Sequence, residues 1–412
     1  MSRNGISLDS RCSGDEDSSH HWNEDRAAAG STLAPADSGK DAWLFLAGSF
    51  VIETLTWGFA LAFGVLQEYY STHEPFAESK NIATVGTTAS GIMYLGLPLW
   101  FMSLLALPST RKVSPYVGLV ILCSAFVASS FATSTNQLIV LQGVFYSLGG
   151  VCVTGTGIGG VIVPLLMDAL LSKYGFRWAL RAWAALVFVL TAPALYFVKP
   201  RLPPSKVREF NLSFLINPTF FILQLGNIVQ GLGYFIPSIY LPTYARYIGG
   251  SPIAGTMTLV AFNTASVVGC VIAGILVDRC HVTTPVALSA AGATFACFGL
   301  WGLAGTISAL FVFSIMYGLF AGGYVATWCG VTMLVTSKKA RVEPSLVYGF
   351  LCAGRGMGNI ISGPVSESLL GESGLHAAMG YGSKFGPLII FTGATALLSG
   401  LTLFARAKPG LL

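Results

Sequence analysis

Two ionisable side chains stand alone inside long apolar runs of this sequence. Glu53 lies about ten residues into a run over 43–66, and Arg355 lies about ten residues into a run over 346–370. If both runs are membrane-crossing helices, a rise of about 1.5 Å per residue places both charges near the midplane. A charge at that depth costs about 2.5–3.5 kcal/mol on insertion scales, so it usually faces the protein interior and is paired there.

Two interpretations of this pair follow from their chemistry. In the functional one, Arg355 holds an anionic group such as a carboxylate, because its planar guanidinium suits bidentate contact. Glu53 is then its counter-ion when no anion is bound, or a proton carrier. In the structural one, Arg355 caps helix carbonyls and locks neighbouring helices together, and Glu53 hydrogen-bonds a nearby backbone group.

A polar stripe marks the apolar run over 218–243. Its members are spaced by 3, 3 and 4 residues, which puts them on one helix face; they are Gln224, Asn227, Gln230 and Tyr234. The stripe predicts the wall of a wet cavity that binds a solute, and the alternative is hydrogen bonding between helices. Further candidates to line the same cavity are Asn263 and Trp328, with Tyr146 and Gln142 as weaker ones.

Four other charged residues lie near the expected span ends. Asp168 and Glu367 are interpreted as interfacial caps rather than ligands. Asp278 and Arg279 stand at an inner helix end, where they predict a gating salt bridge; a solvated pair of little energetic value is the alternative.

Glycines over residues 155–160 fit the spacing G-x-G-x-x-G, which can bind a dinucleotide. No strand precedes them, no acidic residue follows at ribose distance, and the segment lies in an apolar run. The sequence therefore predicts that the glycines let helices approach closely. No Ser/His/Asp order, metal-ligand spacing or P-loop is present either, so we expect no enzyme, no cofactor, no metal and no nucleotide.

The composition indicates which solvent surrounds these residues. The 412 residues are 53% apolar and only 10% charged, with a mean hydropathy of +0.68. Soluble domains carry about a quarter charged residues, so most of this chain is expected in a lipid bilayer. The net charge of +5 lies in short clusters between apolar runs, which does not suggest a nucleic-acid partner.

Ten apolar runs are long enough to cross a bilayer, and the block 137–172 is too long for one crossing. If the amino terminus is inside and the block crosses twice, 13 Lys and Arg residues near span ends are inside and 6 outside; one crossing gives 8 inside and 11 outside. The positive-inside rule therefore favours two crossings and twelve spans. Residues 1–40 are expected to form a disordered cytoplasmic tail.

The chain also repeats itself. Residues 155–175 align without gaps on 354–374, with seven of 21 positions identical. Landmarks just upstream align at an offset smaller by 28 residues, so the first half is expected to lack about 28 residues around spans 4 and 5. Residues 137–153 and 154–172 are then each expected to cross only partway and to meet in a Gly-rich bend.

Two related halves joined by an inner loop resemble the major facilitator superfamily. The resemblance implies an all-α polytopic membrane protein with 11–12 spans and a truncated span 4/5 hairpin. The expected parts are an N-terminal bundle over 41–198, abridged at 137–172, a cytoplasmic inter-bundle loop over 199–217 and a C-terminal bundle over 218–412. The G-x-x-x-D-R turn of the superfamily is similar to Gly274–Arg279.

Five strings resemble one branch of that superfamily, the monocarboxylate-transporter-like proteins in their fungal form. They are DSGKDAW (37–43), TWGFALAFGVLQEYY (56–70), DRCHVTT (278–284), YGLFAGGYVATW (317–328) and GRGMGNIISGP (354–364). Two departures matter: Leu61 stands where animal members carry a lysine tied to proton coupling, and Cys270 where some carry an arginine. The animal coupling chemistry and a simple lactate-type substrate therefore do not transfer.

The resemblance implies a secondary active transporter of small organic anions or related metabolites, working by alternating access. A secondary-metabolite exporter or a vitamin-type carrier is the alternative in the same class, and a transport-inactive truncated form is the alternative in another. The expected partners are the lipid bilayer and a small organic anion, with protons as a candidate coupling ion. The plasma membrane is the default location, and the vacuolar membrane is the alternative.

Overall fold

The computed structural model describes residues 39–77, 79–153, 162–198, 211–337, 342–370 and 379–400. Within these residues the chain is helical and contains no strand. The chain divides into two compact units, Met1–Ala47 and Gly48–Leu412, and residues 40–47 of the first unit open the first helix. The expected cytoplasmic tail and most of the expected inter-bundle loop lie outside the described residues.

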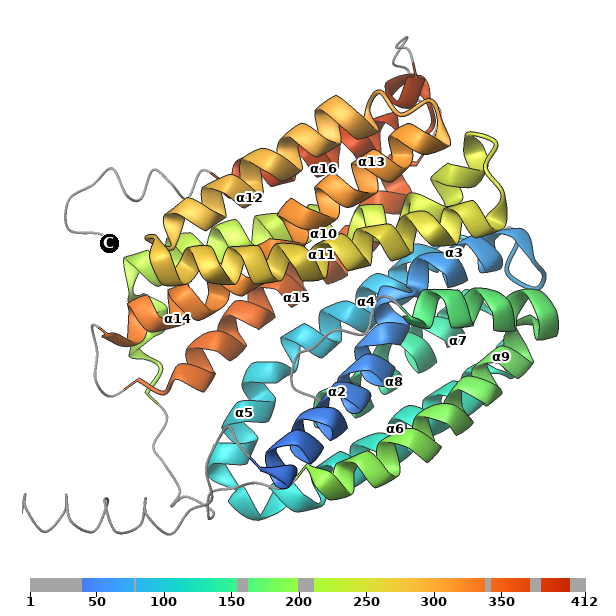
Figure 1. Cartoon of the computed structure of the whole chain (residues 1–412). Coiled ribbons are helices and arrows are strands. Elements are labelled where there is room, and N and C mark those ends of the chain that lie inside the picture. The colour runs from blue at the N-terminus through green and yellow to red at the C-terminus, as the bar shows by residue number, and fades with distance from the viewer. Residues whose placement is uncertain are drawn as a thin grey trace, which may run out of the picture. The chain divides into compact units, whose positions relative to one another are not determined.

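The first half contributes helices that are drawn from blue to green in Figure 1. Its α-helices are α2 (Lys40–Leu61), α3 (Phe63–Thr72), α4 (Ile82–Leu95), α5 (Leu97–Ala106), α6 (Ser114–Ser129), α7 (Thr135–Leu138), α8 (Tyr146–Val153) and α9 (Ile162–Phe197). A short 3₁₀ turn, η1 (Pro108–Lys112), follows α5, and a π-helical segment, η2 (Ile139–Phe145), joins α7 to α8.

The second half contributes helices that are drawn from yellow-green to red. Its α-helices are α10 (Pro218–Tyr247), α11 (Pro252–Arg279), α12 (Thr283–Phe295), α13 (Ile307–Tyr317), α14 (Thr327–Ser337), α15 (Pro344–Leu369) and α16 (Gly386–Ser399). The shorter elements are η3 (Ser213–Ile216), η4 (Ala296–Trp301), η5 (Gly318–Gly322), η6 (Tyr324–Ala326) and η7 (Met379–Gly382).

Eight helices of the described chain are long and apolar enough to cross a membrane. The prediction of an all-helical chain is confirmed, because the described parts of the predicted apolar runs form helices. Helix α15 is 26 residues long but more polar, since its interior carries Arg355 and Asn359. The chain is thus a multi-pass membrane protein whose most polar helix is also one of its most buried ones.

The block over 137–172 is described in two pieces. Thr135–Val153 is a single apolar helical stretch of 19 residues, about 28 Å long, which is enough for a full crossing. This length permits a full crossing, and the expectation that the piece crosses only partway stays a prediction. In the second piece, Gly175 has φ 72° and interrupts α9, so residues 162–174 form a helix of only about 20 Å. The expected Gly-rich bend lies outside the described residues.

Glycines of the second-half repeat allow three helices to pack closely. A Cβ at Gly356 would stand 2.5 Å from the carbonyl oxygen of Gly91 in α4, and one at Gly358 would stand 2.5 Å from that of Ile228 in α10. Real Cβ atoms do not come this close, so α15 can sit between α4 and α10 only with glycine at these positions. The packing interpretation is confirmed for this copy, and the copy at 155–160 lies outside the described residues.

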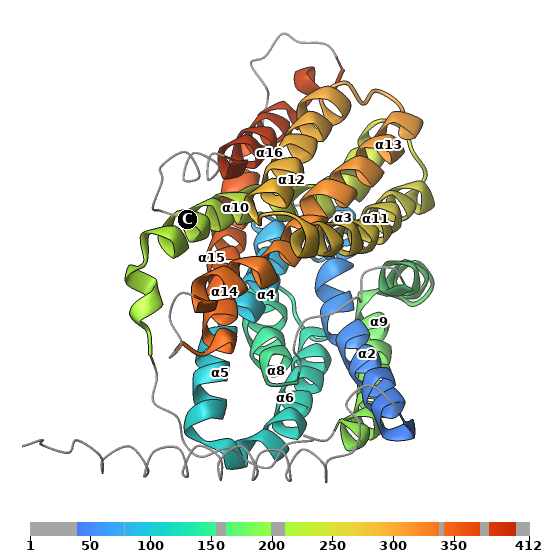
Figure 2. The same ribbon diagram turned by 60° about the vertical axis from the view of Figure 1, so that its left-hand side comes forward.

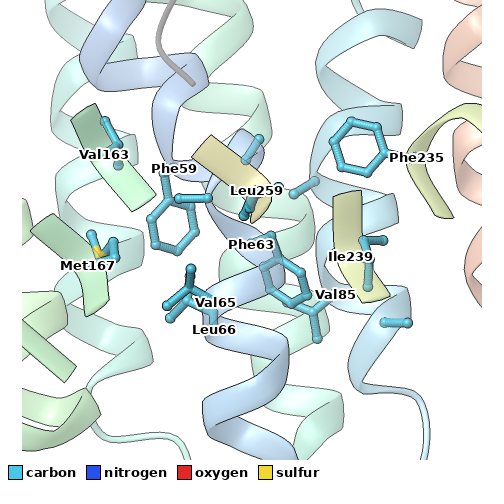
Figure 3. Packing of buried hydrophobic residues seen from close by; sticks show 14 of the residues in the cluster. Phe59, Phe63, Val65, Leu66, Val85, Val163, Met167, Phe235, Ile239 and Leu259 are labelled. Carbon is cyan, nitrogen blue, oxygen red and sulfur yellow. The ribbon is translucent and has the colours of Figure 1, made fainter. Parts of the chain in front are cut away.

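The two halves meet along α4 and α15, which lie side by side in Figures 1 and 2. Beside this contact, an apolar cluster brings together side chains from both halves (Figure 3). Phe63 of α3 and Met167 of α9 contribute from the first half, and Ile239 of α10 and Leu259 of α11 from the second. The halves are thus held together by this apolar packing as well as by the contact between α4 and α15.

Candidate functional site

Arg355 lies in the middle of α15 and is fully buried. Three aromatic rings surround its guanidinium. The Cζ atom lies 3.8 Å from the ring centroid of Tyr234, 5.7 Å from that of Trp328 and 5.8 Å from that of Tyr94. Rings within about 6 Å stabilise a cation through their quadrupoles, more strongly where water is excluded. We call these three residues the aromatic box.

The hydrogen bonds of Arg355 are incomplete. Its Nη1 donates to Oε1 of Gln230 at 3.0 Å, and the Nε2 of Gln230 donates to the carbonyl oxygen of Ala321 at 3.4 Å. Nε and Nη2 are buried and have no hydrogen-bond partner among the described residues. Buried donors are almost always paired, so two bare donors on one buried cation require an explanation.

The position of the bare donors on the guanidinium determines what they can bind. Nε and Nη2 form one edge of the planar group, while Gln230 occupies the remaining nitrogen. That edge presents two parallel N–H bonds, the geometry that grips both oxygens of a carboxylate. The hydrogen bond to Gln230 therefore leaves both nitrogens of the bidentate edge of Arg355 without a partner among the described residues.

The four residues of the polar stripe on α10 have two different roles: two bind the backbone of α15, and two contact the side chain of Arg355. Gln224 and Asn227 donate to the carbonyl oxygens of Phe350 and Leu351, at 2.6 and 2.5 Å, and so tie α10 to α15. This is the hydrogen bonding between helices that the sequence offered as the alternative. Gln230 and Tyr234, by contrast, face Arg355 directly.

Asn227 also fixes the orientation of one wall of the aromatic box. Its Oδ1 accepts a hydrogen bond of 3.1 Å from the indole Nε1 of Trp328. The indole therefore has its polar atom satisfied by the protein and presents apolar ring surface to its other neighbours. Asn227 acts on the site through Trp328.

Tyr94 of α4 is a part of the site that the sequence interpretation missed. Its ring lies 5.9 Å from Trp328 and 4.7 Å from Trp57 of α2, so the site includes side chains from both halves. An aromatic residue in an apolar span gives no distinct signal in one sequence. Only the contact between α4 and α15 places Tyr94 near the cation.

Asn359 is the second missed residue, and it is also fully buried. It follows Arg355 by four residues on α15 and therefore shares its helix face. Its Nδ2 donates to Oγ of Ser90 at 3.3 Å, and its Oδ1 has no partner among the described residues. The spacing of four from a charged intramembrane residue was the signal that could have identified it.

Glu53 is buried on α2, as expected for an intramembrane carboxylate. Among the described residues, however, no ion pair joins Glu53 to Arg355, and the bare nitrogens of Arg355 do not contact it. The structure therefore places both residues inside the protein without pairing them. The counter-ion and proton-carrier roles of Glu53 stay predictions.

The remaining candidates lie away from Arg355 or act between helices. Asn263 of α11 donates to the carbonyl oxygen of Leu61 at 3.5 Å and so links the halves. Asp278 and Arg279 are exposed at the end of α11, and in the described part of the chain neither forms an ion pair.

The two weaker candidates form hydrogen bonds within the first half. Gln142 donates to the hydroxyl of Tyr70 at 3.0 Å, and Tyr146 donates to the carbonyl oxygen of Thr56.

One of the two symmetry-related acids, Glu367, forms a hydrogen bond with the opposite half. Oε1 of Glu367, on α15, accepts from the backbone N–H of Ala83 at 2.7 Å, at the start of α4. Asp168 lies on α9, and its role as an interfacial cap stays a prediction. The cap interpretation describes what Glu367 does, because an anion at a helix N-terminus satisfies free N–H groups and the helix dipole.

Comparison with known proteins gives one family and several transporters. The family model described as Major Facilitator Superfamily matches residues 147–363. The MFS-type transporter pynF of Aspergillus niger is 25% identical over 370 residues, 82% of this chain and 83% of that protein. The aspyridones efflux protein apdF of Emericella nidulans is 25% identical over 403 residues, 89% of this chain and 78% of that protein.

A third relative and a solved structure agree with these matches. The agnestins efflux protein AgnL12 of Paecilomyces divaricatus is 25% identical over 412 residues, 91% of this chain and 92% of that protein. The crystal structure of the nucleoside transporter NupG superposes with a TM-score of 0.67 at 15% identity, covering 89% of this chain and 99% of that one. At that identity, the likeness to NupG concerns the fold alone.

Proposed function

The chain belongs to the major facilitator superfamily, and from that premise we propose that it carries small organic anions across a membrane by alternating access. It is a multi-pass membrane transporter, and the substrate class is the part that we propose. We also propose that it belongs to the monocarboxylate-transporter-like branch of fungi, with its amino terminus in the cytoplasm and the plasma membrane as its location.

One observation carries the proposal of an anionic solute. Arg355 is a fully buried cation with two bare donors and, among the described residues, no carboxylate within ion-pair distance. A buried charge without a partner costs several kcal/mol in effect, and the aromatic box offsets only part of that cost. A bound carboxylate would neutralise the charge and satisfy both donors in one step.

The position of Arg355 supports transport rather than static binding. It lies on α15 where the second half meets the first, and Tyr94 brings a first-half side chain within 5.8 Å of the guanidinium carbon, with Trp57 packed behind Tyr94. In this superfamily the two halves rock about a site near the midplane. A solute that contacts both halves can be passed from one face to the other without a change of binding residue.

Export is the second candidate function, and the named relatives favour it. Two of them are efflux proteins, one for aspyridones and one for agnestins. An anion site of the kind described here serves export or import equally well. Direction is therefore tested by loading vesicles of known orientation and following the labelled anion from either side.

The experiment that tests the anion role uses the purified chain in liposomes with labelled benzoate as probe. We expect Arg355→Ala to abolish uptake and Arg355→Lys to retain only a small part, because lysine offers no bidentate edge. The matched control is Arg177→Ala, which removes an exposed arginine of α9. Uptake by Arg355→Ala at the wild-type rate would reject the proposal.

The same liposomes separate a carrier from a transport-inactive form. A chain that binds benzoate through Arg355 but moves none of it across the bilayer would be inactive in transport. The short helix over 162–174 is the element that would be responsible, because its pseudo-symmetric counterpart, α15, is 26 residues long.

Proton coupling is tested with Glu53→Gln, which we expect to abolish the dependence of uptake on a pH gradient while exchange continues.

A further inference from the structure

We infer that Asn359 determines specificity: its Oδ1 accepts a hydrogen bond from a hydroxyl or amine group of the solute whose carboxylate Arg355 holds. The inference rests on the proposed function, because it assigns a second contact within the same site. It names the solute more closely, as an organic acid that also carries a hydrogen-bond donor and a flat unsaturated body.

The first step is the state of the Asn359 side chain. It is fully buried, and its Oδ1 has no hydrogen-bond partner among the described residues. Leaving a buried acceptor unsatisfied costs about 1–3 kcal/mol. Arg355, four residues earlier on the same face, carries two further bare polar atoms. Three buried atoms without a partner thus belong to two side chains that are one helical turn apart on α15.

The second step is the orientation of the amide, which determines whether the bare atom is a donor or an acceptor. Ser90 of α4 donates its hydroxyl proton to the carbonyl oxygen of Thr87 at 3.2 Å. Its Oγ is then an acceptor, so the Asn359 nitrogen faces it at 3.3 Å and the oxygen faces away. The reverse orientation would compete for the only hydroxyl proton of Ser90 and lose the bond to Thr87.

The third step is the complementarity of the whole set. Arg355 offers two donors on one edge, and Asn359 offers one acceptor a helical turn along. A ligand that satisfies all three needs an anionic acceptor pair and a separate donor. The rings of Tyr94, Tyr234 and Trp328 lie within 6 Å of the guanidinium carbon. A flat acid gains stacking on such rings that a saturated acid of equal size does not.

The test measures binding to the purified full-length chain in lipid nanodiscs near neutral pH, where carboxylates are ionised and phenols are not. The probes are benzoate, meta-hydroxybenzoate, para-hydroxybenzoate and para-methoxybenzoate, which carries an acceptor but no donor. We expect one hydroxybenzoate to bind about threefold to tenfold more tightly than benzoate. We expect para-methoxybenzoate to bind no better than benzoate.

Two variants change the acceptor in different ways. Asn359→Leu should bring the ratio of hydroxybenzoate to benzoate affinity to one while benzoate itself still binds. Ser90→Ala leaves Asn359 in place but frees its amide to turn, so para-methoxybenzoate should gain relative to benzoate. The matched control is Asn136→Leu, an exposed asparagine of α7, for which the wild-type ratio is expected.

The outcomes separate this inference from the anion proposal. Equal binding of benzoate and both hydroxybenzoates by the wild type, with binding lost in Arg355→Ala, overturns the role of Asn359 and leaves the anion site standing. An unchanged ratio in Asn359→Leu overturns it as well. If the hydroxybenzoate preference persists in both wild type and Arg355→Ala and only Asn359→Leu removes it, Asn359 is supported and the anion proposal fails.

Discussion

Helix α15 carries two charged side chains, Glu367 and Arg355, which differ in how fully the protein satisfies them with hydrogen bonds. Near its end, the carboxylate of Glu367 accepts a hydrogen bond of 2.7 Å from the backbone N–H of Ala83 at the start of α4. In its middle, the guanidinium of Arg355 has one hydrogen bond and two bare donors. The same helix thus holds one charge whose partners are built into the protein and one whose partners are not.

The difference indicates what each charge is for. A saturated charge that joins two halves stabilises a particular arrangement of helices, because the donors of α4 would otherwise lack a partner. An unsaturated, fully buried charge lowers stability and persists where a ligand completes it. The comparison therefore predicts that removing the two charges changes folding stability in opposite directions.

The largest expected effect is on Arg355→Leu. Loss of both charge-assisted hydrogen bonds should lower organic anion affinity at least about a hundredfold, at about 1.5–3 kcal/mol per bond. The thermal unfolding temperature in detergent should stay equal or rise, because an uncompensated buried cation is replaced by an apolar side chain. A clear fall in that temperature would show that Arg355 is a structural residue like Glu367.

The next largest effect is expected for Gln230→Glu, which gives Arg355 a counter-ion within the protein. The new carboxylate would stand about where Oε1 accepts from Nη1 at 3.0 Å. It should compete with a solute for the cation, and we expect anion affinity to fall at least about tenfold while folding stability rises. Titration with benzoate measures this fall, and Gln230→Leu controls for loss of the amide.

A smaller effect, on stability rather than binding, is expected for Glu367→Gln. The neutral amide keeps an acceptor near Ala83 but loses the charge that favours a helix N-terminus. We expect a loss of about 1 kcal/mol in the free energy of unfolding and unchanged affinity for benzoate. If anion affinity drops as much as in the Arg355 variants, the two charges belong to one site, and the assignment of a structural role to Glu367 and a binding role to Arg355 is wrong.

The smallest effect is expected for Trp328→Phe. The ring is kept, but the hydrogen bond from the indole to Asn227 is lost, so the wall of the aromatic box becomes less fixed. We expect benzoate affinity to fall about threefold, in line with one neutral hydrogen bond. Trp178→Phe, an exposed tryptophan of α9, should leave affinity unchanged.

Much of the site could be predicted from single residues and their spacing. Arg355 stood out because a charge in an apolar run is costly, and Gln230 and Tyr234 because a spacing of 3 or 4 puts side chains on one face. The packing interpretation of the glycines at 155–160 rested on the absence of a preceding strand and on the apolar run around them, and Gly356 and Gly358 of the aligned second copy confirm it. Each of these inferences uses only the chemistry of one helix and its solvent.

The predictions that stayed open required knowledge of a second helix. Residues 137–153 were expected to cross partway because the block is too long for one span and short for two; residues 135–153 are long enough for a full span, and which of the two holds stays open. Glu53 and Arg355 were expected to pair because both are charged and deep. Equal depth gives only their position along the membrane normal and not their separation in the membrane plane. No ion pair joins them in the described chain.

By itself, the sequence determined that this chain lies in a membrane as helices and that one arginine must be buried there. Those outcomes follow from transfer free energy and helix periodicity, which act on local segments. The tertiary structure decided that Tyr94 and Ser90 of α4 lie against α15, that Glu367 is satisfied, and that Arg355 and Asn359 are not. Whether a buried polar atom finds a partner depends on which helices become neighbours, and no single helix contains that information.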